Sequence, residues 1–256
     1  MRGFARVAGL VLVAGAPLLA MSYGTAISAA PAAPERPAAD TARDADRKPE
    51  VMLAFAGVRK GAVVADLMPG RGYFTRLFST AVGARGKVYA VVPSEFLARM
   101  PKAADAVQAI AATPGYGNVA VVTTPAAVLA LPQAVDIAWT AQNYHDLYGF
   151  QGVAAAQAFD RAVYAVLRPG GIFVIEDHSA LPGTSATSPT TLHRIDEAVV
   201  KEQVEAAGFV LVGESAALRN PADPRDIAIF APAIRGHTDQ FVLKFRKPGR
   251  ASGSGG

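Results

Sequence analysis

The stretch VVADLMPGRGYFT, Val63 to Thr75, decides the fold of this chain. An apolar run ends in a carboxylate at Asp66, and a Pro-Gly-x-Gly turn at 69–72 leads into a predicted helix. Glycines let a backbone approach a ligand closely, and the free N–H groups and the dipole of a helix N-terminus face that ligand. The stretch therefore predicts a strand, a tight turn and a helix start that together form a cradle for a polar small molecule.

Strand-like and helix-like segments alternate on both sides of this cradle. Strands are expected at 62–68, 87–93, 118–124, 135–141 and 171–177, with a sixth from Phe209 and extended segments at 226–231 and 240–247. Helices are expected at 49–58, 73–83, 95–113 (bent or broken at Pro101), 153–167 and 195–208. Successive β-then-α units predict an α/β fold, a mostly parallel sheet with helices on both faces. Ligands of such sheets bind at the carboxyl ends of the strands, where the glycine turn lies.

The two ends of the chain differ in composition from the rest. Arg2 and Arg6 precede an apolar run at 7–21 and then small residues, which is the pattern of an export signal. We expect a signal peptide at 1–30, cleaved between about Ala26 and Ala33, and an exported protein, periplasmic in a Gram-negative host. An uncleaved N-terminal anchor is the alternative, although the run is shorter than the roughly 20 residues of a spanning helix.

The remaining boundaries follow from composition and charge. Residues 31–47 are rich in Pro, Ala and charge and are predicted to be a disordered linker, the domain is expected at 48–248, and 249–256 is a flexible tail. The 256 residues include no cysteine, which excludes disulfides, thiolate nucleophiles and cysteine metal sites. The net charge is +4 without a basic stripe, so no nucleic-acid partner is predicted.

The glycine turn does not fit the common nucleotide motifs. The dinucleotide fingerprint needs a third glycine where Thr75 stands and an acid at the end of the second strand, where Val92 stands. No Gly-Lys-Ser/Thr follows the turn, which excludes a P-loop. The sequence therefore disfavours NAD as the ligand.

Several segments, in order, resemble the class I S-adenosylmethionine-dependent methyltransferases. They are DLMPGRG, GKVYAVVPSE, LRPGGIFVIED, the AGF turn after the helix at 195–208, and QFVLKFRKP. NYHDLY, EDHSA, LHRID and GHTDQFVLKFRKP resemble a subset of predicted methyltransferases that bear signal peptides. The resemblance covers roughly 48–248. It implies a Rossmann-like fold whose mostly parallel seven-stranded sheet receives an antiparallel terminal strand, and S-adenosylmethionine as cofactor.

The resemblance also assigns cofactor-binding residues, with departures from the family pattern. The candidates are Asp66, Met68, Pro69, Gly70, Arg71, Gly72, Tyr73, Glu95 and Asn143. Met68 stands where the family usually has glycine, Val92 replaces the acid that holds the ribose, and Thr123 and Thr124 replace the adenine acid. Glu95 is expected to reach the ribose instead. Each lost charge-assisted hydrogen bond costs on the order of 1.5–3 kcal/mol, so the resemblance implies weak cofactor binding.

Histidines and carboxylates follow the fourth and fifth strands. His145 and His178 are expected at the carboxyl edge, where either could be the base that removes a proton from a methyl acceptor, oriented by Asp146 or Asp177. The alternative is that these side chains cap helices and loops. Together with His193 they form an N/O ligand set, but their spacing matches no metal motif, and no metal ligand is predicted.

Aromatic residues complete the predicted site. Tyr144 and Tyr148 flank His145 in a predicted loop and are candidates for an acceptor pocket, whereas Trp139 is expected in the core. The sequence predicts a methyltransferase acting on a small molecule, at oxygen rather than nitrogen, with no nucleic-acid partner, and no membrane partner after signal cleavage. An exported non-catalytic ligand-binding module and a metal-assisted hydrolase are the alternatives. The oligomeric state stays open.

Overall fold

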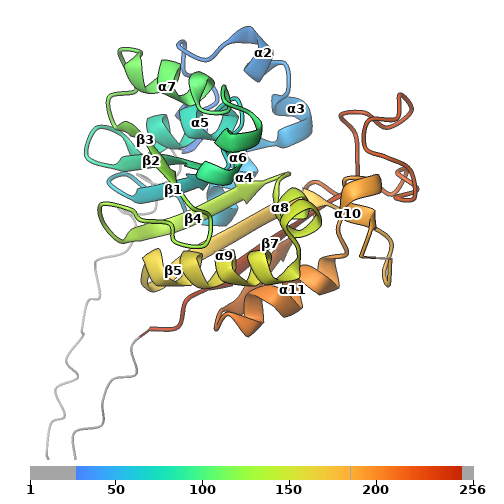
Figure 1. Ribbon diagram of the computed structural model, residues 1–256. Coiled ribbons are helices and arrows are strands. Elements are labelled where there is room, and N and C mark those ends of the chain that lie inside the picture. Colours follow the sequence, from blue (N-terminus) through green and yellow to red (C-terminus); the bar gives the residue numbers. More distant parts are fainter. Residues whose placement is uncertain (1–26, 185, 250–256) are drawn as a thin grey trace, which may run out of the picture.

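The computed structural model describes residues 27–184 and 186–249, and its strands form one mostly parallel sheet (Figure 1). The strands are β1 Val63–Leu67, β2 Lys87–Pro93, β3 Val119–Thr124, β4 Val135–Ala141, β5 Leu167–His178, β6 Val210–Ser215 and β7 Gln240–Arg246. Their order is β3-β2-β1-β4-β5-β7-β6, and β7 runs antiparallel to both β5 and β6. The predicted seven-stranded sheet with an inserted antiparallel terminal strand is confirmed.

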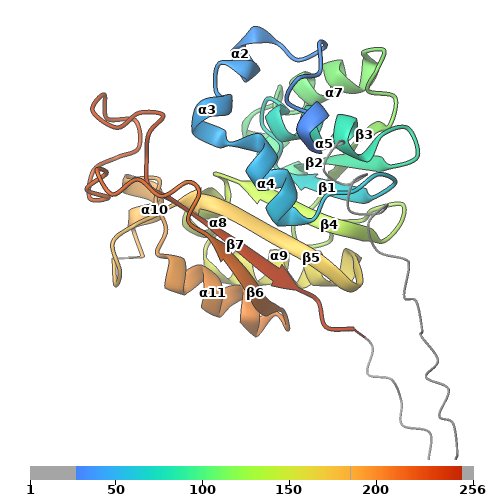
Figure 2. The same ribbon diagram turned by 180° about the vertical axis from the view of Figure 1, so that it is seen from behind.

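Helices cover both faces of this sheet (Figure 2). On one face lie α4 Pro49–Ala56, α5 Tyr73–Val82 and α7 Asp105–Ala112, and on the other lie α8 Tyr144–Gln151, α9 Val153–Val166 and α11 Glu197–Ala206. Shorter helices are α2 Ala38–Thr41, α3 Asp44–Arg47, α6 Ser94–Arg99 and α10 Ser188–Thr191. Successive strand residues point to opposite faces, so Val64 and Trp139 join one core, whereas Ala65 and Phe173 join the other. The expected core position of Trp139 is confirmed.

The helices show how two local sequence features act in the structure. The helix expected at 95–113 is broken at Pro101 into α6 and α7, because proline cannot supply the backbone N–H of a continuous helix. Asp196 caps α11 by accepting the backbone N–H of Ala198 at 2.9 Å. The described residues include no helix long and apolar enough to cross a bilayer.

The extended segment predicted at 226–231 is wrong, because these residues form turns and bends. They belong to the loop between β6 and β7, which lies beside α10 in Figure 1. The backbone groups of this loop form hydrogen bonds with groups that are not part of a neighbouring strand. The carbonyl of Ile227 accepts from the Arg194 guanidinium at 2.8 Å, and the N–H of Ile229 donates to the carbonyl of Leu192. An apolar alternation cannot reveal such partners, because they come from a distant part of the chain.

The disordered linker predicted at 31–47 is also wrong. This segment contains α2 and α3, and within it Arg36 bonds Asp44 at 2.6 Å. The segment packs on α5, since Asp40 accepts from Arg76 of that helix at 2.9 Å. Ala30 is fully buried in the core. The folded domain therefore extends N-terminal to the expected boundary at 48, into the last residues assigned to a signal peptide. Charges that suggest a solvated linker are here matched by carboxylates and guanidinium groups of the fold.

Arg47 connects this segment to the central sheet through a buried ion pair. Its guanidinium lies 3.1 Å from Glu176 Oε1 on β5, and the Glu176 side chain is fully buried. The rest of the expected signal peptide, 1–26, and the tail from 250 onward lie outside the described residues.

Candidate functional site

The glycine turn lines a cavity of about 300 Å³, called the turn pocket below. Its floor is the turn itself, with Met68, Pro69, Gly70 and Arg71, and its walls come from the end of β2, from α6 and α7, and from Asn143 and Asp146 after β4. Five of the nine predicted cofactor-binding residues therefore lie together: Met68, Pro69, Gly70, Arg71 and Asn143.

The other four predicted cofactor-binding residues lie outside the lining. Asp66 is buried behind the turn and accepts from Thr75 Oγ1 at 2.6 Å, and the Tyr73 hydroxyl donates to Asp44. Both oxygens of Glu95 accept the backbone N–H of Ala126 at 3.2 Å, and the contact of Glu95 with a ribose stays a prediction. Gly72 lies under the turn, where an added Cβ would come within 2.2 Å of Ile110 Cδ1.

The turn keeps a left-handed backbone despite its departure from the family pattern. Met68 has φ +55°, a conformation that favours glycine, and its side chain is buried in the core below the turn. Asn143 Nδ2 donates to the carbonyl of Met68 at 2.8 Å and to that of Ala141 at 2.6 Å. This amide joins the end of β4 to the turn and holds the carbonyl of Met68 in place.

Asp66 gives the site a testable pH dependence. Burial outweighs the hydrogen bond from Thr75 and raises the pKa of Asp66 to about 7. Between pH of about 4 and 7 the folded state keeps this proton while the unfolded carboxyl releases it, so the free energy of unfolding falls as pH rises, by up to about 1.4 kcal/mol per pH unit.

The Asp66→Asn variant has no carboxyl at this position and therefore lacks this pH-dependent loss of stability. We expect its free energy of unfolding, relative to the unmodified protein, to rise by roughly 2–3 kcal/mol from pH 5 to pH 7 in guanidinium titrations. A constant difference would show that Asp66 is already ionised in the fold.

His145 is held between two carboxylates. Its Nδ1 lies 2.7 Å from Asp177 Oδ1, its backbone N–H donates to Asp177 Oδ2, and its Nε2 lies 3.2 Å from Asp146 Oδ1. Burial opposes the charge on this ring, but attraction to Asp177 and Asp146 outweighs it and raises the pKa of His145 to about 10. A histidine that keeps its proton at neutral pH is a poor general base. The expectation that His145 is the base is therefore not supported by its surroundings.

His178 has the opposite character. Burial outweighs the attraction of Asp177 and lowers the pKa of His178 to about 4, so its ring is neutral at physiological pH. Nδ1 lies 2.7 Å from Thr238 Oγ1. When Nδ1 donates this hydrogen bond, Nε2 carries the lone pair that accepts a proton. Of the two predicted bases, His178 is therefore the one whose ring is free to accept a proton at neutral pH.

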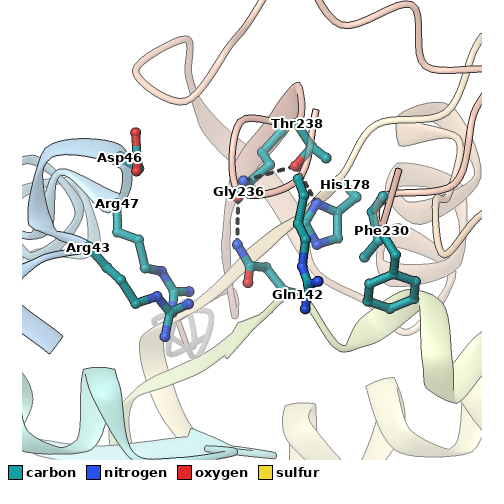
Figure 3. Close-up of a pocket in the computed structure, with 11 residues that line it drawn as sticks. Arg43, Asp46, Arg47, Gln142, His178, Phe230, Gly236 and Thr238 are labelled. Carbon is teal, nitrogen blue, oxygen red and sulfur yellow. Dashed lines mark hydrogen bonds between the residues drawn. The ribbon is translucent and has the colours of Figure 1, made fainter. Parts of the chain in front are cut away.

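His178 borders a second cavity, of about 420 Å³, called the arginine pocket below (Figure 3). Arg43 and Arg47 approach it from the N-terminal segment, and Arg235 and Thr238 from the loop that precedes β7. Gln142, at the end of β4, completes the wall beside the turn pocket. Sequence reasoning missed Arg43 and Arg47, because 31–47 was assigned to a disordered linker. The Arg-x-x-x-Arg spacing of 43 and 47, which places both side chains on one helical face, was the available signal.

The predicted aromatic acceptor wall is not formed. The segment 144–151 is helix α8 rather than a loop. Tyr144 is fully buried and donates to Asp160 at 2.7 Å, and Tyr148 packs against the same core. The arginine pocket is instead lined by arginines, by the amides of Gln142 and Gln240, and by the ring of Phe230.

Comparisons with known proteins bear on the fold and on the class of protein. No family model matches the chain. The chain is 29% identical over 196 residues to the ubiquinone/menaquinone biosynthesis C-methyltransferase UbiE of Yersinia enterocolitica and of Yersinia pestis; the match covers 74% of this chain and 65% of each relative. The chain thus spans slightly less than two thirds of the length of these curated relatives.

Solved structures show the same fold at low sequence identity. A S-adenosylmethionine-dependent methyltransferase from Aquifex aeolicus has a TM-score of 0.56 at 20% identity, over 78% of this chain and 89% of that one. The glycopeptide N-methyltransferase MtfA, complexed with sinefungin, has a TM-score of 0.53 at 15% identity, over 81% and 87%. A possible exported protein from Bordetella parapertussis has a TM-score of 0.51 at 17% identity, over 80% and 67%.

The sheet order, the glycine turn and these structures define a Rossmann-like protein with the class I methyltransferase fold. Within that class the chain is similar in sequence to UbiE methyltransferases. The resemblance to class I S-adenosylmethionine-dependent methyltransferases, predicted from the sequence, is confirmed.

Proposed function

We propose that this protein is an S-adenosylmethionine-dependent methyltransferase that acts on a small molecule. One observation carries the proposal: the two cavities border adjacent residues at the end of β4, since Asn143 lines the turn pocket and Gln142 lines the arginine pocket. A donor in the first pocket and an acceptor in the second would meet at this strand end. Holding two reactants in line is the main contribution that such a site makes to a transfer reaction.

The turn pocket suits the donor. Its turn and the N-terminus of α5 supply backbone N–H groups to a polar ligand, and Phe96 and Met100 supply apolar surface. The sequence relatives, which are named as methyltransferases, support S-adenosylmethionine as this ligand. When bound, S-adenosylmethionine supplies an electrophilic methyl group.

The arginine pocket suits an acceptor that carries an anionic group. Among the described residues no carboxylate pairs with the guanidinium of Arg43 or Arg235, whereas Arg47 is paired with Glu176. Guanidinium groups bind carboxylates and phosphates through paired hydrogen bonds. We therefore assign the acceptor to small molecules that bear a carboxylate, phosphate or sulfate.

We assign the reacting atom of the acceptor to oxygen, with His178 as base. S-adenosylmethionine, when bound, would supply the methyl group to the acceptor oxygen, and His178 Nε2 would accept the proton that the hydroxyl loses. Thr238 keeps the ring oriented through Nδ1. The C-methyltransferase name of the Yersinia relatives makes transfer to carbon the competing outcome.

Calorimetry with S-adenosylmethionine and S-adenosylhomocysteine tests the donor site. We expect both to bind, and Gly70→Leu to weaken S-adenosylhomocysteine at least about tenfold by filling the turn pocket. Gly57→Leu is the matched control, because Gly57 also has a positive φ and open space around its Cα but lies at the end of α4. No binding of either ligand at millimolar concentration would contradict the proposal.

Radiolabelled methyl transfer tests the acceptor. Pools of small hydroxy acids and sugar phosphates are expected to accept label, and Arg43→Gln is expected to raise KM for them, while Arg85→Gln, an exposed change, leaves it unaltered. Binding of cofactor without transfer to any pool would favour the non-catalytic ligand-binding module.

We also propose that the protein is exported. The proposal rests on Arg2, Arg6 and the apolar run at 7–21, and a structural neighbour from Bordetella parapertussis is titled a possible exported protein. Because Ala30 is buried, cleavage near Ala26 would keep the folded domain whole. N-terminal sequencing of protein from the native host tests this: an intact Met1 would contradict cleavage, and recovery from the cytoplasm would contradict export.

A further inference from the structure

We propose that His145, Asp146 and His193, the His–Asp–His cluster, bind a divalent transition-metal ion such as Zn²⁺. The sequence spacing alone predicts no metal ligand, because His193 lies 47 residues beyond Asp146 along the chain. The fold brings the three side chains together beside the turn pocket, which Asp146 also lines. The inference is independent of whether S-adenosylmethionine binds.

The spacing of the ligand atoms suits an ion. His145 Nε2 and His193 Nδ1 each lie 3.2 Å from Asp146 Oδ1, and one ligand atom of each residue lies within 4.8 Å of the others. Zn²⁺ binds imidazole nitrogen and carboxylate oxygen at about 2.0–2.2 Å. Two ligands at that bond length in a tetrahedron are about 3.3–3.6 Å apart. Small side-chain movements would therefore complete the coordination.

Asp177 supplies the second layer of such a site. It is fully buried, and its Oδ1 lies 2.7 Å from His145 Nδ1 while Oδ2 accepts the His145 backbone N–H. Metal-binding histidines commonly donate their other ring N–H to a carboxylate, which fixes the tautomer and orients the ring. Here that arrangement directs Nε2 of His145 at the cluster, where a bound ion would displace the proton that Nε2 otherwise shares with Asp146. Of the ligand set considered from the sequence, Asp177 is thus a positioning residue, and His178 is outside the cluster.

His193 is placed by a strained backbone. Its φ is +55°, although left-handed conformations are uncommon for residues other than glycine and cluster at functional sites. Its ring lies between Phe150 and Phe230, with ring centroids 6.1 and 4.9 Å away. The fold therefore holds Nδ1 toward Asp146 at a local energetic cost.

The cluster remains accessible to a further ligand. The side chains of Asp146 and His193 are 30% and 25% exposed, while that of His145 is 2% exposed. Two nitrogens and one carboxylate leave an open coordination position, as in catalytic rather than structural zinc sites. An ion here would offer a Lewis acid to a water molecule or an acceptor oxygen beside the turn pocket.

The competing interpretation is a hydrogen-bonded network without metal, in which Asp146 accepts from both histidines. Zinc titration of untagged, full-length protein, stripped with a chelator and dialysed, separates the two. We expect one Zn²⁺ per chain with a dissociation constant in the micromolar range or below. Cobalt substitution is expected to give the visible absorption bands of a four- or five-coordinate nitrogen–oxygen site.

Variants identify the ligands. Loss of an outer-layer partner commonly costs 10–100-fold in metal affinity, so Asp177→Asn should weaken Zn²⁺ binding by about that factor. His193→Ala removes a direct ligand and should weaken Zn²⁺ binding more, by at least about 100-fold. His237→Ala, which removes an exposed histidine on another surface, should leave it unchanged. Thermal melts confirm that each variant folds. Absence of binding tighter than about 0.1 mM, or equal affinities for His193→Ala and the unmodified protein, would overturn the proposal, and neither result depends on methyl transfer.

Discussion

Replacing Arg194 by methionine is expected to lower the free energy of unfolding by about 3–5 kcal/mol, the usual cost of removing one partner of a buried ion pair. The guanidinium of Arg194 and the carboxylate of Asp223 are both fully buried, 2.9 Å apart. Arg194 also donates to the carbonyls of Ser179 and Ile227, so it ties the loop before β7 to the end of β5. Without Arg194, the carboxylate of Asp223 remains buried with the backbone N–H groups of Arg225 and Asp239 but loses its charged partner. Guanidinium unfolding monitored by circular dichroism measures the loss.

The control for Arg194 is a lysine with surface partners. Lys201 pairs with Glu197 and Glu214 on the surface, and Lys201→Met is expected to cost less than about 1 kcal/mol. The double variant Arg194→Met/Asp223→Leu removes both charges and should recover part of the lost stability. Equal effects of Arg194→Met and Lys201→Met would contradict the buried pair.

Arg47→Met is the second change expected to cost about 3–5 kcal/mol, because it leaves the carboxylate of Glu176 buried without its partner. The second oxygen, Glu176 Oε2, has no hydrogen-bond partner within the described residues, and the nearby guanidinium of Arg43 attracts Glu176 without forming an ion pair with it. The same unfolding measurement applies. This substitution also tests the fold of the N-terminal segment directly, since a disordered linker would not respond to it.

Arg43→Met provides the comparison, because Arg43 lies four residues earlier and pairs with no carboxylate among the described residues. Its loss is expected to cost less than about 1 kcal/mol. Arg47→Met/Glu176→Gln should be more stable than Arg47→Met alone, because a neutral amide is cheaper to bury than an unpaired carboxylate. An Arg47→Met variant as stable as Arg43→Met would restore the linker interpretation.

The strands and the turn were predictable because their signals are local. A buried parallel strand is a continuous apolar run, and β2 and β4 have the predicted bounds 87–93 and 135–141. The glycine turn was predictable because positive φ values favour glycine, as at Gly70 and Gly72. Four lining residues of the turn pocket, Met68, Pro69, Gly70 and Arg71, follow from this local pattern.

The charged parts of the site were not predictable, because the state of an ionisable side chain depends on partners distant in the sequence. His145 and His178 are similar in sequence context, yet one ring is held charged by Asp177 and Asp146 and the other is kept neutral by burial. The surroundings of Glu95 were not predictable for the same reason, since its carboxylate accepts the N–H of Ala126 from a segment 31 residues away.

The sequence by itself determined the α/β fold, the glycine turn at 69–72 and the edge of the sheet that bears the site, because hydrophobic periodicity and turn chemistry are written in neighbouring residues. Only the tertiary structure decided that 31–47 folds over this edge, that arginines line the second cavity, and that His193 joins His145 and Asp146. These features depend on charges from separate segments meeting in a buried place, where pairing and desolvation set their energies. No single stretch of sequence carries that information.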